Sequence, residues 1–307
     1  MSELPVTVII KHALHGGYFC LTQNPKTVLM KSILVATDFS PASVNAVEFA
    51  AQLAKQLNAR LHLLHVYHMP LIASDIPVVP DLSSMEKESL DRLEKLGEDL
   101  NEKYGITPFV KAEMGFTTDE INEYKEAINA DLIVLGMHGH NKASELFIGS
   151  TTASYIENTK TPLLVVPSDA KYKMPEWIAF ASDLKGLQIH SLDALKECAL
   201  SFKAKVNIVN VTEGELLPDY NKSVAGIQLD HYFEELSHLF FFPEGKNVTE
   251  GIDEFIAEHK TDWLALVHRK HGLFDRMFNK SVTKKMIYHT HLPLLVLPEL
   301  PYTDTPK

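Results

Sequence analysis

"ILVATD" at residues 33–38 returns 145 residues later as "IAFASD" at 178–183. The next apolar run, "LHLLHV" (61–66), returns at the same spacing as "VNIVNV" (206–211). Self-similarity at a fixed spacing is the sequence signature of a repeated structural unit. The chain is therefore expected to contain one fold twice.

Two later segments repeat at a shorter spacing of 131 residues. "ADLIVLG" (130–136) matches "TDWLALV" (261–267), and "KTPLLVVP" (160–167) matches "HLPLLVLP" (291–298). The spacing falls from 145 to 131, so the second copy is fourteen residues shorter. The extra length of the first copy lies around the proline-containing residues 68–84, which are typical of a loop.

Short apolar runs alternate with helical patterns in each copy. "SILVAT" (32–37) has the β-branched content of a buried strand, and the helical pattern of residues 40–58 follows, with Ser40 as N-cap and Pro41 at its first position. Such alternation predicts right-handed crossovers and a parallel sheet. We predict the α/β class, with two tandem five-stranded, parallel-sheet, Rossmann-like domains that carry helices on both faces. The other elements expected in the first copy are strands at 60–66, 108–115, 131–136 and 162–167 and helices at 84–105, 118–129 and 150–159.

The repeat also sets the predicted boundaries. Met30 begins "MKSILVATDFS", which resembles a natural domain start, so residues 1–29 are either an extension or the product of an upstream start, and we assign them no function. The expected parts are a first domain at 30–168, a linker at 169–177, a second domain at 178–300 and a tail at 301–307.

Composition limits the possible partners and location. The 307 residues carry a net charge of −11 without a basic cluster, which argues against a nucleic-acid or anionic-membrane surface. No run approaches the roughly 18 apolar residues of a membrane span. The two cysteines, Cys20 and Cys198, form neither a metal-type pair nor a disulfide framework, so we expect a reducing cytoplasm.

Glycines gather where the strand at 131–136 ends and the helix at 150–159 is about to begin. Gly136, Gly139 and Gly149 are followed by Ser150 and Thr151. Repeated glycine indicates positive φ angles or close backbone approach. Ligands of open parallel sheets bind beyond the carboxyl ends of the strands, and a helix start favours an anion. The pattern is neither a Walker loop nor a G-x-G-x-x-G turn, yet a nucleotide phosphate chain fits it.

The spacing Gly, two residues, Gly, nine residues, Gly-Ser resembles the ATP-binding motif of the universal stress protein family. "ILVATDFSPAS" (33–43) is similar to the opening strand of that family with its acidic residue. The resemblance covers residues 30–168 well and 174–300 in weaker form.

The resemblance implies an ATP site, with Mg²⁺, formed by two groups of residues. Those implied around the adenine and ribose are Ala36, Thr37, Asp38 and Val66. Those implied around the ribose and phosphates are Gly136, Gly139, Gly149, Ser150, Thr151 and Thr152. Each of these binding roles has a structural alternative. Asp38 could cap a helix, and the glycines could form a tight turn around an empty pocket.

The second copy departs from the motif. Val267, Lys270 and Lys280 stand where the first copy has its glycines, although Ser281 keeps its match and Asp183 keeps the strand-one carboxylate. Side chains here occupy the space that a nucleotide needs, so we predict that the second copy does not bind ATP in the family manner.

Histidines do not indicate a metal site. His62 and His65 lie on one predicted strand but point to opposite faces, so they cannot share an ion. His138 and His140 lie inside the glycine loop, where they could contact a γ-phosphate.

Three functions remain open on the sequence. The first is an ATP-binding regulatory protein of the stress response that is not an enzyme. The second is a slow ATPase or phosphotransferase, for which Asp38 and His138 are candidates without a visible orienting partner. The third is an interaction module that binds no nucleotide.

Assembly follows from the last apolar run of each copy. The resemblance implies that such last strands pair between domains, and "TPLLVVP" and "LPLLVLP" are nearly identical. The unpaired backbone groups of an exposed edge strand can form hydrogen bonds with another strand. We therefore expect an intramolecular pseudo-dimer of the two copies and, as an alternative open to the same edges, a homodimer.

Overall fold

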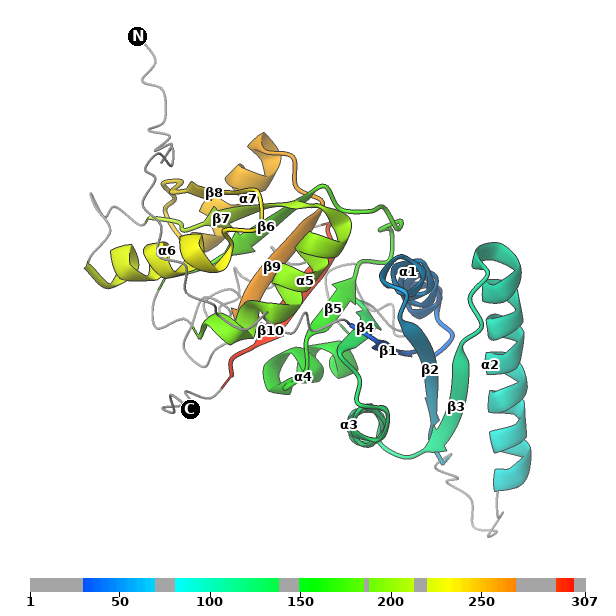
Figure 1. Cartoon of the computed structure of the whole chain (residues 1–307). Coiled ribbons are helices and arrows are strands. Elements are labelled where there is room, and N and C mark those ends of the chain that lie inside the picture. The colour runs from blue at the N-terminus through cyan, green and yellow to red at the C-terminus, as the bar shows by residue number, and fades with distance from the viewer. Residues whose placement is uncertain are drawn as a thin grey trace, which may run out of the picture.

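The computed structural model describes six ranges of the chain (Figure 1), namely 30–69, 81–137, 149–184, 188–212, 220–268 and 291–300.

Strands and helices alternate along both halves of the chain, here called the first half (30–168) and the second half (177–300). The first half contains β1 (Ser32–Ala36), α1 (Pro41–Leu57), β2 (Arg60–Tyr67), α2 (Leu82–Tyr104), β3 (Phe109–Met114), α3 (Thr117–Ile128), β4 (Leu132–Gly136), α4 (Ser150–Asn158) and β5 (Leu163–Val166). The second half contains β6 (Trp177–Ala181), the 3₁₀ helix η1 (Ile189–Leu192), α5 (Asp193–Phe202), β7 (Lys205–Val209), α6 (Tyr220–Tyr232), β8 (His238–Phe241), α7 (Val248–Glu258), β9 (Trp263–His268) and β10 (Leu294–Pro298).

The ten strands of the described residues form one sheet in the order β3-β2-β1-β4-β5-β10-β9-β6-β7-β8. The α/β class and the parallel pairing within each half are as predicted, and the expected pairing of the last strands joins the two five-stranded sheets into one. β5 and β10 pair antiparallel at the centre, with Leu164 opposite Leu295 (Figure 1). The physical reason is that both strands are apolar along their length (LLVV and LLVLP), so neither is suited to an edge exposed to water, and pairing buries both.

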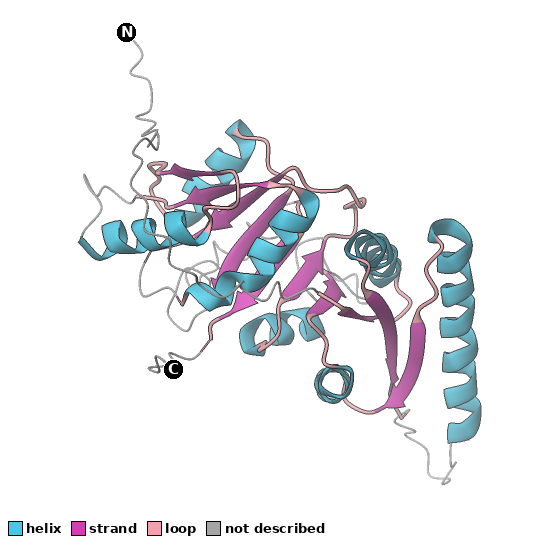
Figure 2. Ribbon diagram, viewed as in Figure 1, coloured by secondary structure: helices cyan, strands magenta, loops and turns pink. Residues whose placement is uncertain are grey.

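Helices cover both faces of the sheet (Figure 2). One apolar cluster packs α1, α2, α5 and α6 against one face, and a second cluster packs α3, α4 and α7 against the other. Each cluster includes strand residues from both halves. The ring of Phe49 in α1, for example, lies 6.2 Å from that of Trp263 in β9. The two halves therefore share their hydrophobic core.

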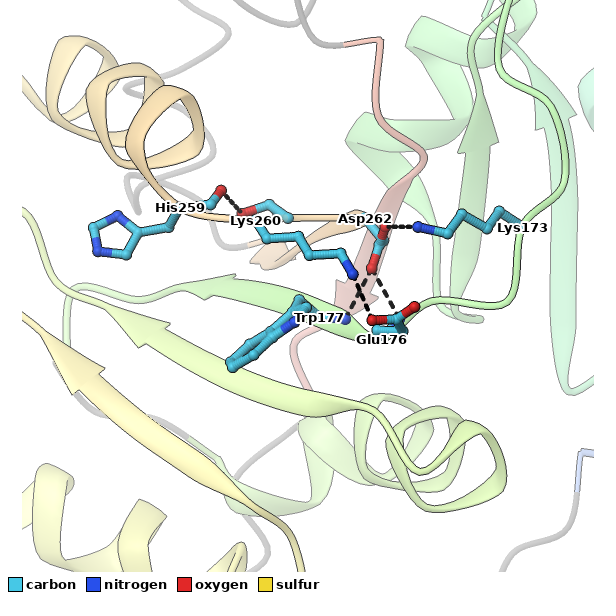
Figure 3. A network of polar contacts seen from close by, with 7 residues as sticks. Lys173, Glu176, Trp177, His259, Lys260 and Asp262 are labelled. Carbon is cyan, nitrogen blue, oxygen red and sulfur yellow. Dashed lines mark hydrogen bonds and ion pairs between the residues drawn. The ribbon is translucent and has the colours of Figure 1, made fainter.

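An aspartate fixes the start of the first strand in each half. Asp262 Oδ2 accepts hydrogen bonds from the backbone N–H groups of Glu176 (2.8 Å) and Trp177 (3.0 Å), and Lys173 Nζ lies 3.1 Å from Oδ1 (Figure 3). Asp131, which precedes β4, accepts two equivalent backbone hydrogen bonds at the start of β1. Its Oδ2 accepts from the backbone N–H groups of residues 31 (2.8 Å) and 32 (3.0 Å). The repeat thus extends to individual hydrogen bonds.

The shared core predicts that the two halves unfold together. Both tryptophans, Trp177 and Trp263, lie in the second half, whereas Leu63 is fully buried in the first. We expect Leu63→Ala to lower the free energy of unfolding by about 2–5 kcal/mol, because it leaves a cavity in the core. Tryptophan fluorescence and circular dichroism in urea should show the same lowered midpoint. An unchanged tryptophan midpoint would show that the halves unfold separately.

Glu197 joins the halves in a second way. This α5 side chain is 6% exposed and accepts a hydrogen bond from the backbone N–H of Met30, just before β1. Burial raises the pKa of the Glu197 carboxyl to about 7, although the bond from Met30 opposes the shift. The folded protein therefore holds a proton that the unfolded chain releases at lower pH.

We expect this proton to make stability depend on pH. Because the pKa is higher in the folded state, its contribution is complete at low pH and is lost as pH rises from the ordinary value of 4.5 through about 7. The wild type should lose stability relative to Glu197→Gln over this window, measured as the free energy of unfolding in urea. Parallel curves for the two proteins would contradict the assignment.

Candidate functional site

The first half reverses its strand order between β1 and β4. From β1 the chain runs outward through β2 and β3, and then returns to place β4 and β5 on the other side of β1. β1 and β4 are paired neighbours, with Val35 opposite Val134. Ligands of open α/β sheets bind at such a reversal, beyond the carboxyl ends of the strands.

The turn after β1 is fixed by short-range hydrogen bonds. Thr37 Oγ1 accepts from the backbone N–H of Phe39 (3.0 Å), and Asp38 Oδ1 accepts from that of Ser40 (3.0 Å). Ser40 is the N-cap of α1, as predicted, and accepts from Ser43 N (3.2 Å). The capping role that the sequence left open for Asp38 thus belongs to Ser40. The exposed Asp38 carboxylate instead stabilises the turn through the hydrogen bond that it accepts from Ser40.

Phe39 completes the turn in a conformation that its residue type does not predict. Its φ is +60°, in the left-handed region that non-glycine residues seldom adopt. The ring lies 4.5 Å from that of His65 and 4.0 Å from the guanidinium of Arg92, measured to its centroid. His65 and Arg92 come from β2 and α2, so two elements hold this turn. Sequence reasoning did not find Phe39 or Arg92, because a phenylalanine gives no signal of a positive φ.

Gly136, at the end of β4, allows α1 to approach the sheet. A Cβ at this position would lie 2.9 Å from the carbonyl oxygen of Ala42 and 3.2 Å from the backbone nitrogen of Ser43. In the second half, Val267 stands at the matching position, and α5 begins only at Asp193, after η1. The glycine therefore has a packing role that the sequence did not indicate.

α4 begins beside the end of β4 with a cap that has no side chain. Gly149 is its N-cap and donates from its backbone N–H to Met137 O (2.8 Å), without a side-chain capping bond. Thr152 is 5% exposed, and its hydroxyl donates to Gly136 O (2.8 Å). Ser150 is exposed. The first N–H groups of a helix lack partners within it and attract anions.

Nine of the ten residues named from the sequence lie within the described part of the chain. They occupy the carboxyl ends of β1, β2 and β4 and the start of α4, and they are Ala36, Thr37, Asp38, Val66, Gly136, Gly149, Ser150, Thr151 and Thr152. Gly139 lies outside the described residues, as do His138, His140, Lys270, Lys280 and Ser281.

The predicted opposition of His62 and His65 is confirmed. His62 stacks on Phe109 at 4.9 Å and lies 3.2 Å from Tyr124 Oη on the α3 side of the sheet, whereas His65 contacts the β1–α1 turn. Burial lowers the pKa of both imidazoles. Among the described residues, no cluster of three or more His, Cys, Asp or Glu could hold a metal ion, and no helix could cross a membrane.

Comparison with known proteins supports the resemblance noted in the sequence. The model of the universal stress protein family matches residues 30–167. Universal stress protein A homolog 1 of Coxiella burnetii is 30% identical over 145 residues, which are 44% of this chain and 95% of that protein. The chain belongs to the universal stress protein family.

Other universal stress proteins extend the comparison. One from Methanocaldococcus jannaschii is 29% identical over 146 residues, which cover 47% of this chain and 85% of that protein. The crystal structure of a universal stress protein from Archaeoglobus fulgidus is similar with a TM-score of 0.68 and 17% identity, and the match covers 88% of this chain and 98% of that one. The fold likeness thus extends well beyond the residues matched by the family model.

The packing role of Gly136 can be tested against another glycine. Gly136→Ala should destabilise the protein by about 1–3 kcal/mol, because the added methyl group overlaps the α1 backbone. Gly226 in α6 is the control, since a Cβ there meets nothing within 4 Å. Gly226→Ala should be neutral or stabilising by up to about 1 kcal/mol. Equal unfolding midpoints for both variants in urea would refute the packing role.

Proposed function

We propose that this universal stress protein is an ATP-binding regulatory protein, and that its first half holds the nucleotide together with Mg²⁺. The observation that supports the proposal most is the position of Asp38 and the start of α4 on the same edge of the sheet, at the reversal between β1 and β4. A carboxylate and a helix start are suited to the two polar parts of a nucleotide, its hydroxyls and its phosphates.

The residues at this edge fit the parts of ATP. Val66, at the end of β2, is an apolar residue suited to an adenine ring, and the exposed Asp38 carboxylate can accept hydrogen bonds from ribose hydroxyls. Gly149 leaves the start of α4 without a capping side chain, and the exposed Ser150 adds a hydroxyl donor. When bound, Mg²⁺ would neutralise phosphate charge.

The proposal includes an asymmetry between two tandem domains that form a pseudo-dimer within one chain. The antiparallel β5–β10 pairing and the equal strand order of the halves support this arrangement. Val267 replaces Gly136 in the second half, and lysines replace the two later glycines. One nucleotide site per chain is therefore expected.

Calorimetric titration of nucleotide-free protein with ATP and Mg²⁺ tests the proposal. We expect one site per chain, lost in Gly139→Val, which places a side chain where the backbone would meet phosphate. Asp38→Ala should weaken binding about 10- to 100-fold, because hydrogen bonds to a charged group contribute about 1.5–3 kcal/mol.

Asp183→Ala is the matched control for Asp38→Ala, since Asp183 holds the same position in the second half and should leave ATP affinity unchanged. Absence of binding in the wild type would refute the proposal, and two sites per chain would refute its asymmetry. Release of inorganic phosphate, measured on the same samples and lost in Asp38→Ala, would favour the slow ATPase instead.

A further inference from the structure

A side chain on β2 holds the turn that carries Asp38. The ring nitrogen Nδ1 of His65 lies 2.8 Å from Thr37 O, so this nitrogen carries the proton and donates to the carbonyl. The same ring packs against Phe39. Asp38 lies between Thr37 and Phe39, so His65 restrains the residues on both sides of the carboxylate.

The second half repeats this turn with a different side chain. Leu184 has a φ of +54°, and its backbone N–H donates to Ser182 Oγ (3.1 Å), as Phe39 does to Thr37. Asn210 Nδ2 donates to Ser182 O (2.8 Å), at the place that His65 occupies in the first half. Asp183 lies between the two restrained residues. An amide can thus replace the imidazole as the donor to this carbonyl.

We infer that His65 is a positioning residue of the nucleotide site, which holds the β1–α1 turn so that Asp38 meets the ligand in one orientation. The inference rests on the proposed function. His65 lies behind the turn and bonds to its backbone, so it acts on the ligand through Asp38.

The burial of His65 and the charges near it favour a neutral imidazole. Burial lowers the pKa of its imidazole, and Arg92 from α2 and His68, directly after β2, also lower it, whereas the bond to Thr37 and the charge of Asp38 raise it. The net direction is downward, so the ring is neutral at physiological pH, with its proton on Nδ1.

Three variants test the inference by ATP calorimetry with Mg²⁺. His65→Ala removes the donor and should weaken binding three- to tenfold, as expected for the loss of one hydrogen bond of about 1 kcal/mol. His65→Asn supplies the amide that the second half uses, and should restore the affinity to within about twofold of wild type. Asn210→Ala removes the equivalent bond from the second half, and should lower the melting temperature without changing ATP affinity.

The outcomes separate the inference from the proposed function. Wild-type affinity in His65→Ala, or an equal loss in Asn210→Ala, would overturn the positioning role while ATP binding stands. Failure of the wild type to bind ATP would overturn both. If His65→Ala does not fold, His65→Phe replaces it, because phenylalanine keeps a ring beside Phe39 but cannot donate to the Thr37 carbonyl. A three- to tenfold loss is expected there, and unchanged affinity would overturn the inference.

Discussion

The antiparallel pairing of β5 with β10 is the contact on which the architecture depends. Each half ends in a short strand that is apolar along its length, and such a strand is not suited to an edge exposed to water. Pairing removes both edges and makes one sheet of ten strands. It also brings the helices of the two halves into common apolar clusters, so each half contributes to the stability of the other.

Repetition reaches below the level of the fold. Asp131 and Asp262 bind the starts of β1 and β6 in the same way, and the turns after these strands share a left-handed residue and a side-chain donor to a carbonyl. The halves differ where the glycines of the first are replaced. The framework of the turn is therefore common to both halves, whereas the glycine spacing 136, 139 and 149 occurs in the sequence of the first alone.

The order of strands and helices could be predicted from the sequence, because alternating apolar and helical patterns define these elements. Ser40 and Pro41 likewise mark the start of α1. Periodicity within a strand says nothing about its neighbours, so the pairing of β5 with β10 could be expected only from the family resemblance. Gly136 shows a further limit. A glycine indicates that a side chain is missing, but not whether a helix backbone or a ligand takes the space. The left-handed Phe39 gave no signal at all.

The direction of the strands at the central junction has a consequence for communication within the chain. Strands are parallel within each half and antiparallel across β5 and β10, so the carboxyl ends of β1 and β6 lie on opposite edges of the sheet. Among the described residues, the strand ends of one half therefore point away from those of the other. Any coupling between the described strand ends of the two halves must therefore pass through the packed interior that both halves share.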